Sequence, residues 1–139
     1  MIIGYTTGVF DMFHIGHLNI LRLAKEQCDF LIVGVSTDEL VQEYKHKSPI
    51  IPFGERIEIV KSIRFVDKVI AQETLDKKLA WEKLHFNVLF HGSDWKESAL
   101  YKKTEKDLKE VGARIVWIPH TQGISSTMLA EKLQSEDNI

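Results

Sequence analysis

The sequence predicts an α/β fold in which a five-stranded parallel sheet carries helices on both faces. Five short β-rich runs recur along the chain, and segments with helical spacing separate them. The runs are apolar without strict alternation, which is typical of parallel strands that are covered on both sides. The 139 residues, 44% of them hydrophobic and 27% charged, suit one domain. We therefore expect a single domain over residues 1–134 and a polar tail over residues 135–139.

The expected strands can be placed in chain order from their β-branched and aromatic content. They cover residues 2–5, 30–35, 68–71, 88–91 and 114–118. Between the first two strands, Leu18, Leu21 and Ala24 recur at helical spacing and would share one face of a helix. This alternation of strand and helix predicts crossover connections between parallel strands.

Local start and stop signals support the remaining helices. Residues 36–39 read Ser-Thr-Asp-Glu, the form of a capping box, and predict a helix start after the second strand. Pro52 precedes apolar helical spacing over residues 57–63, where its fixed φ and missing N–H do no harm. Gly112 follows a helical stretch at residues 101–111, where a glycine commonly ends a helix.

Composition and charge exclude several classes of protein. Eighteen Lys and Arg against twenty Asp and Glu argue against a nucleic-acid binder. The single cysteine, Cys28, cannot form an internal disulfide, which suits a reducing compartment. The longest apolar run, residues 30–35, is far shorter than the roughly 20 residues of a membrane span. The first residues lack the basic start of a secretory signal, so we expect a cytoplasmic protein without membrane insertion.

The loop after the first expected strand is the strongest candidate site, because parallel α/β sheets bind ligands where loops leave the carboxyl ends of their strands. That rule favours residues 6–16 and 120–126. His14 and His17 stand three apart at a helix start, so they project from nearly the same side. Free N–H groups at the helix start attract anions, and Gly16 permits close approach. We expect a phosphate site with two neutral-to-cationic donors. A zinc site is the alternative, although no third ligand follows in motif spacing.

Two motifs carry a resemblance to a known family. Gly8-x-Phe10-Asp11 followed by His14-Ile15-Gly16-His17 resembles the HxGH nucleotidyltransferase superfamily. Residues 121–127, Thr-Gln-Gly-Ile-Ser-Ser-Thr, are similar to its second signature. Further similarity runs through residues 33–39, Arg56, 63–67 and 92–95, and is greatest to the cytidylyltransferases.

The resemblance implies a Rossmann-like domain that transfers CMP from CTP to a small alcohol phosphate, with glycerol 3-phosphate expected. Mg²⁺ would accompany CTP, and the products would be a CDP-alcohol and pyrophosphate. The family also suggests a homodimer and a role in making wall teichoic acid or capsule precursors. The chemistry is physically reasonable, because a phosphate whose second pKa is about 6 is already an ionised nucleophile near neutral pH. The enzyme then supplies alignment and charge neutralisation rather than a general base.

The resemblance also assigns roles to residues. The catalytic set is His14, His17, Lys45 and Lys47, and no protein ligand to a metal is expected. The nucleotide-binding set is Thr7, Gly8, Val9, Phe10, Asp11, Gly16, Arg64, Asp94, Trp95, His120, Thr121, Gly123, Ile124, Ser125, Ser126 and Thr127. Two positions depart from the family: His120 stands where arginine is usual, and Val9 where threonine is frequent. The first change puts nucleotide affinity, its pH dependence and base preference in question.

Alternative functions stay open on the sequence. The acceptor could be choline or ethanolamine phosphate, or the enzyme could be an adenylyltransferase, since ATP users share both signatures. An aminoacyl-tRNA synthetase fragment is disfavoured by length and charge, and a non-catalytic nucleotide-binding module by the complete set of histidines, lysines and Ser125. Outside the motifs, we expect His91 to be a core histidine because it lies in an apolar run.

Overall fold

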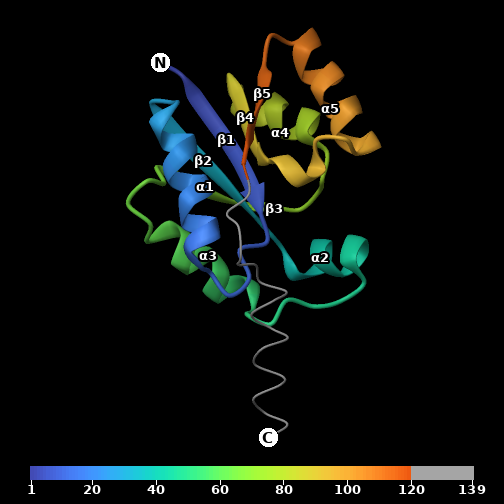
Figure 1. The fold of residues 1–139 in the computed structure, drawn as a ribbon. Coiled ribbons are helices and arrows are strands. Elements are labelled where there is room, and N and C mark those ends of the chain that lie inside the picture. The colour runs from blue at the N-terminus through green and yellow to red at the C-terminus, as the bar shows by residue number, and fades with distance from the viewer. Residues whose placement is uncertain (120–139) are drawn as a thin grey trace, which may run out of the picture.

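A computed structural model describes residues 1–119, whose helices pack on both sides of one sheet (Figure 1). The strands are β1 (Ile3–Gly8), β2 (Phe30–Ser36), β3 (Lys68–Gln72), β4 (Val88–Gly92) and β5 (Arg114–Ile118). The helices are α1 (Ile15–Glu26), α2 (Asp38–Lys45), α3 (Phe53–Lys61), α4 (Lys77–Leu84) and α5 (Ala99–Glu110), with a short 3₁₀ turn, η1 (Ser93–Trp95). The predicted domain boundary at residue 134 and the predicted tail lie outside the described residues.

The sheet is parallel throughout and has the strand order β3-β2-β1-β4-β5. The chain moves outward from β1 through β2 to β3, and then crosses back to place β4 on the other side of β1. The order therefore reverses between β1 and β4, which is where Rossmann-like sheets form a ligand crevice at the carboxyl ends of the strands. The predicted fold class is confirmed.

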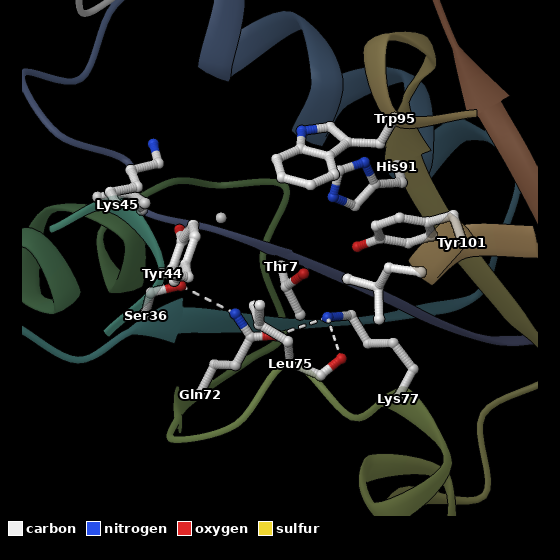
Figure 2. Close-up of a pocket in the computed structure, with 13 residues that line it drawn as sticks. Thr7, Ser36, Tyr44, Lys45, Gln72, Leu75, Lys77, His91, Trp95 and Tyr101 are labelled. Atoms are coloured by element: carbon white, nitrogen blue, oxygen red, sulfur yellow. Dashed lines mark hydrogen bonds between the residues drawn. The ribbon is translucent and has the colours of Figure 1, made fainter. Parts of the chain in front are cut away.

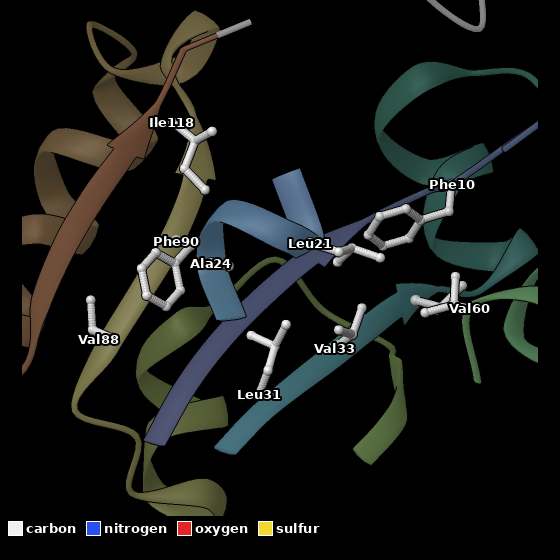
Figure 3. Packing of buried hydrophobic residues seen from close by; sticks show 10 residues of the cluster. Phe10, Leu21, Ala24, Leu31, Val33, Val60, Val88, Phe90 and Ile118 are labelled. Carbon is white, nitrogen blue, oxygen red and sulfur yellow. The ribbon is translucent and has the colours of Figure 1, made fainter. Parts of the chain in front are cut away.

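Two hydrophobic cores fill the two sides of the sheet. On one side, Leu21 and Ala24 of α1 and Val60 of α3 pack on Val33 and Phe90 of the sheet (Figure 3). The expected apolar face of the first helix is therefore the face that is buried. The second core forms on the opposite side, under α4 and α5.

In this second core, Tyr5 and Leu89 of the sheet pack against Tyr101 and Leu108 of α5. The Tyr5 ring also stacks on Phe86, with 5.2 Å between ring centroids. Gly34 makes this packing possible, because a Cβ at that position would lie 2.5 Å from the Tyr5 hydroxyl oxygen. Burial on both faces explains why the strands read as apolar runs rather than as alternating ones.

Several element boundaries differ from those predicted. β1 continues to Gly8 instead of ending at residue 5, because Thr6 and Thr7 pair with β2 in the parallel ladder. The cap of α2 is Thr37, whose hydroxyl accepts the N–H of Leu40 at 3.1 Å, so the capping box expected to begin at Ser36 is wrong. Ser36 instead ends β2.

Two further helices show how local signals succeed and fail. Helix α4 was not predicted, although Asp76 caps it by accepting the N–H groups of Lys78 and Leu79. At the end of α5, Gly112 has φ of 83° and its N–H donates to the Lys109 carbonyl, while the next N–H reaches back to Leu108. This paired bonding is a Schellman motif, so the predicted helix stop is confirmed.

Candidate active site

Two adjoining cavities open at the carboxyl ends of β1 and β4, where the strand order reverses. The larger holds about 470 Å³ and is lined by the loop after β1, by Lys45 and Lys47, and by Gly92 and Asp94. The smaller holds about 150 Å³ and lies between α2, α4 and α5. Thr7, Gly8 and Val9 line both cavities. The loop that sequence reasoning favoured thus lies at the centre of the site.

The loop after β1 turns sharply before entering α1. Phe10 and Met12 adopt φ of 55° and 48°, a left-handed conformation that bulky residues seldom take. Such backbone costs about 1–3 kcal/mol per residue and persists only where packing enforces it. The buried Phe10 ring, with centroids 6.2 Å from Phe13 and 5.5 Å from His17, supplies that packing.

The two histidines of the loop cap α1 with their own rings. His14 Nδ1 accepts the N–H of Gly16 at 3.0 Å, and His17 Nδ1 accepts the N–H of His14 at 3.2 Å. The rings stack with 4.0 Å between centroids. Because each Nδ1 accepts a hydrogen bond, the neutral form of each ring must carry its proton on Nε2. The capping bonds therefore make both side chains Nε2–H donors.

His17 is held in its neutral form. Burial, followed by the neighbouring His14, lowers the pKa of His17 to about 3 despite the opposing effect of Asp11. The sequence predicted neutral-to-cationic donors, and the structure narrows this to a neutral donor for His17. A neutral imidazole whose Nδ1 is occupied can donate to an anion but is poorly placed to abstract a proton.

Asp11 ties this loop to the segment that follows the lysines. Its two carboxylate oxygens accept the N–H groups of Ile50 and Ile51, each at 2.8 Å. The resemblance places Asp11 in the nucleotide-binding set, and the structure shows its carboxylate bound to two backbone N–H groups of another loop. The carboxylate thereby fixes one wall of the larger cavity.

Arg56 is a structural residue of the site to which sequence reasoning gave no role. Its guanidinium is fully buried and donates to the carbonyls of Val9, Ser36 and Ile51 at 2.7–2.8 Å. It also pairs with Asp38 at 2.6 Å. The carbonyls belong to three separate segments: the residue after β1, the end of β2 and the segment that precedes α3. An arginine inside an apolar helical pattern was the signal that could have indicated it.

Lys45 and Lys47 flank a helix end. Lys45 is the last residue of α2, and His46 caps it in a left-handed conformation with φ of 58°. Both lysines line the larger cavity. Burial, and then the charge of Lys47, lowers the pKa of Lys45. Two cations at one cavity wall suit a polyanionic ligand.

The smaller cavity brings together residues that the sequence did not assign to a site (Figure 2). They include Tyr44 from α2, Gln72 from β3, Lys77 from α4 and Tyr101 from α5. His91 also lines this cavity, so its predicted role as a core histidine is incomplete. It is largely buried, as expected, and that burial lowers its pKa to about 4, but its side chain borders both cavities.

The remaining predicted site residues differ in their position relative to the two cavities. Thr7, Gly8 and Val9 line both cavities, while Phe10 and Asp94 border only the larger one. Trp95, 40% exposed, borders both. Gly16 is buried in the first turn of α1.

Arg64 lines neither cavity: it is exposed, and its guanidinium lies 4.9 Å over the Phe65 ring. The predictions for His120, Thr121, Gly123, Ile124, Ser125, Ser126 and Thr127 lie outside the described residues. Within residues 1–119, no three metal-ligating side chains gather into a cation site. In that same part of the chain, every helix is too short or too polar to cross a membrane.

The fold and the histidine-capped loop define a nucleotidyltransferase. Comparison with known proteins then specifies the family. The model of the cytidylyltransferase-like family matches residues 5–132, and the chain belongs to this family. Glycerol-3-phosphate cytidylyltransferase of Staphylococcus aureus is 35% identical over 133 residues, which cover 95% of each chain.

Another relative matches over a smaller share of its own length. Ethanolamine-phosphate cytidylyltransferase of Dictyostelium discoideum is 31% identical over 147 residues, covering 93% of this chain but 37% of its own. Among solved structures, a lipopolysaccharide core biosynthesis protein from Thermoplasma volcanium has a TM-score of 0.73 at 23% identity. The match covers 89% of this chain and 99% of that one. This structural likeness supports the fold.

Proposed function

We propose that the protein transfers CMP from CTP to glycerol 3-phosphate, releasing pyrophosphate. An oxygen of the acceptor phosphate attacks the α-phosphorus of CTP, and the bond from that phosphorus to the oxygen bridging to the β-phosphate breaks. No proton has to be removed, since the acceptor phosphate is ionised at neutral pH. The observation that carries this proposal is the pair of histidines whose Nδ1 atoms are occupied by backbone N–H groups.

The two cavities suit a division between the substrates. We assign the triphosphate to the larger cavity, where His17, Lys45 and Lys47 meet the start of α1. Asp94 and Trp95 border the same space and would contact the base or ribose. The acceptor tail would occupy the smaller cavity, which joins the larger at Thr7 and Lys45. This arrangement puts the reacting phosphates at the junction, beside the cationic wall.

Mg²⁺ would enter with the nucleotide. Within residues 1–119, the carboxylates that border the larger cavity are Asp11 and Asp94, and Asp11 already accepts hydrogen bonds from two backbone N–H groups. This donor set fits Mg²⁺ held chiefly by phosphates and waters, as is usual for this ion. When bound, the ion would neutralise charge on the triphosphate. Following the family resemblance, we extend the proposal to a cytoplasmic homodimer that makes precursors of wall teichoic acid or capsule.

The function is tested by measuring pyrophosphate release with CTP or ATP as donor and glycerol 3-phosphate as acceptor. We expect turnover with CTP, formation of CDP-glycerol, and little activity with ATP. A preference for ATP would refute the nucleotide assignment. Absence of turnover with glycerol 3-phosphate, alongside turnover with another alcohol phosphate, would refute the acceptor.

A further inference from the structure

We propose that Phe13 is a positioning residue of the transfer reaction, whose ring holds the His17 imidazole so that its Nε2–H points into the larger cavity. This inference rests on the proposed function, because it makes His17 a donor to the transferred phosphate. Phe13 itself lines neither of the two cavities described above, although His17 borders the larger one. Its influence on the reaction therefore passes through the ring that it touches.

Three aromatic rings pack together at the start of α1. The ring centroid of Phe13 lies 5.3 Å from that of His17, with 39° between the ring planes, and 6.2 Å from that of Phe10. Phe10 in turn meets the His17 ring edge-on, with 5.5 Å between centroids. These separations are within the range in which aromatic rings attract one another. The His17 ring therefore has two phenyl neighbours in addition to His14.

Phe13 connects the His17 ring to the hydrophobic core. It is partly buried and packs against the core that α1 and α3 form on the sheet, and Phe10 belongs to that core (Figure 3). The His17 ring borders a cavity instead, and its Nδ1 is held by the N–H of His14 at 3.2 Å, the upper end of the usual range. One long hydrogen bond does not fix the tilt of a ring, so the packing has to set the direction of the Nε2–H.

The Phe13 ring also keeps water away from the imidazole. Burial is the largest cause of the lowered pKa of His17, and the charges that act on the ring are those of His14, Asp11 and Lys45. Without the phenyl ring, water would reach His17 and its pKa would rise from about 3 towards its ordinary 6.5. A protonated ring carries a proton on Nδ1, which would face the N–H of His14 and break the capping bond.

The test replaces Phe13 and measures turnover with CTP and glycerol 3-phosphate. We expect Phe13→Ala to lower kcat by at least about tenfold at pH 8, since a misplacement of about 1 Å costs a catalytic group up to 10²-fold. Phe13→Leu keeps an apolar cover and should stay within about threefold of the native kcat. Phe30→Ala is the matched control: Phe30 is also partly buried against a core, but it begins β2, at the end of the strands remote from the site. This control should leave kcat unchanged.

The state of the His17 ring separates positioning from a general loss of stability. Nitrogen NMR signals of the imidazole report its tautomer and its pKa without any substrate. In the native protein, Phe13→Leu and Phe30→Ala, the ring should stay neutral with its proton on Nε2 at pH 5. In Phe13→Ala we expect the pKa to rise above about 5 and the ratio of variant to native kcat to fall as the pH drops from 8 to 5. The ratio cancels the ionisation of the acceptor phosphate.

A double-mutant cycle tests whether Phe13 acts through His17. Phe13→Ala introduced into His17→Ala should lower kcat by less than about twofold, against at least about tenfold in the native background. Equal losses in both backgrounds would overturn the inference, and so would a folded Phe13→Ala protein with native kcat or an unchanged His17 ring. Phe13→Val replaces the alanine variant if circular dichroism shows that variant to be unfolded. Failure of the native protein with every alcohol phosphate would instead refute the proposed function, while the NMR signals would still test the ring contact.

Discussion

Removing the His17 ring has two effects that can be separated by design. His17→Ala loses the Nε2–H donor, and it also loses the Nδ1 atom that accepts the N–H of His14. His17→Asn loses the distal donor as well, but its amide oxygen can take the place of Nδ1. The two variants therefore distinguish the contribution of the ring to catalysis from its contribution to the helix cap.

The structure sets the expected size of each effect. Loss of one preorganised donor to a developing charge lowers kcat by about 10²–10³-fold, and we expect this in both variants. Loss of the capping bond lowers the unfolding free energy by about 1 kcal/mol, which we expect only for His17→Ala. The affinity for CTP should change much less than kcat, since the lysines and the helix start remain.

The assay combines steady-state pyrophosphate release, CTP binding by calorimetry and unfolding in urea. His85→Asn is the matched control, because His85 is exposed and precedes β4. It therefore lies at the amino-terminal end of the parallel strands, whereas the site lies at their carboxyl end. Because His17 is neutral, its contribution to kcat should also be constant from pH 5 to 8. A variant with normal kcat and lost CTP binding would refute the assigned role, and so would full activity in His17→Asn.

Three further outcomes follow from other contacts. Arg56→Ala should lower the unfolding free energy by about 3–5 kcal/mol, because the buried carbonyls lose their hydrogen-bond donor and Asp38 loses its ion-pair partner. A loss below about 1 kcal/mol in urea unfolding would contradict this prediction. Asp11→Ala should speed hydrogen exchange at the two loop amides that it binds by at least about tenfold, and unchanged exchange rates would show that the contact is unimportant. Stability should fall as the pH drops from about 6.5 towards 4, because unfolded histidines take up protons there while folded His17 and His91, with pKa values of about 3 and about 4, do not. His91→Asn should flatten this dependence in urea titrations, and an identical slope would count against it.

The strands were predictable because burial on both faces leaves an apolar run that survives in the sequence. The ends of the strands were not predictable. Thr6 and Thr7 have the sequence of loop residues, and they extend β1 only because they pair with β2. Helix α4 was missed for a related reason. Its sequence is polar and short, and its position depends on packing against α5 rather than on a strong apolar period.

The site was only partly accessible to sequence reasoning. His14 and His17 could be singled out because a short motif and a topological rule point to the same loop, and the structure places both rings at the start of α1. Lys77 and Gln72 were missed because they come from α4 and β3, and no sequence spacing links them to the loop after β1. The neutral state of His17 was likewise beyond the sequence, because it arises from burial that only the folded chain creates.

The buried guanidinium of Arg56 has a consequence for exchanging parts between related enzymes. Since it fastens the backbone at Val9, Ser36 and Ile51 at once, these three segments form one rigid rim. If the histidine loop alone were transferred to another enzyme, it would lack the hydrogen bond from Arg56 that fixes its position relative to the end of β2 and to the segment before α3. Chimeras should therefore move the loop, the end of β2 and the start of α3 as a single cassette.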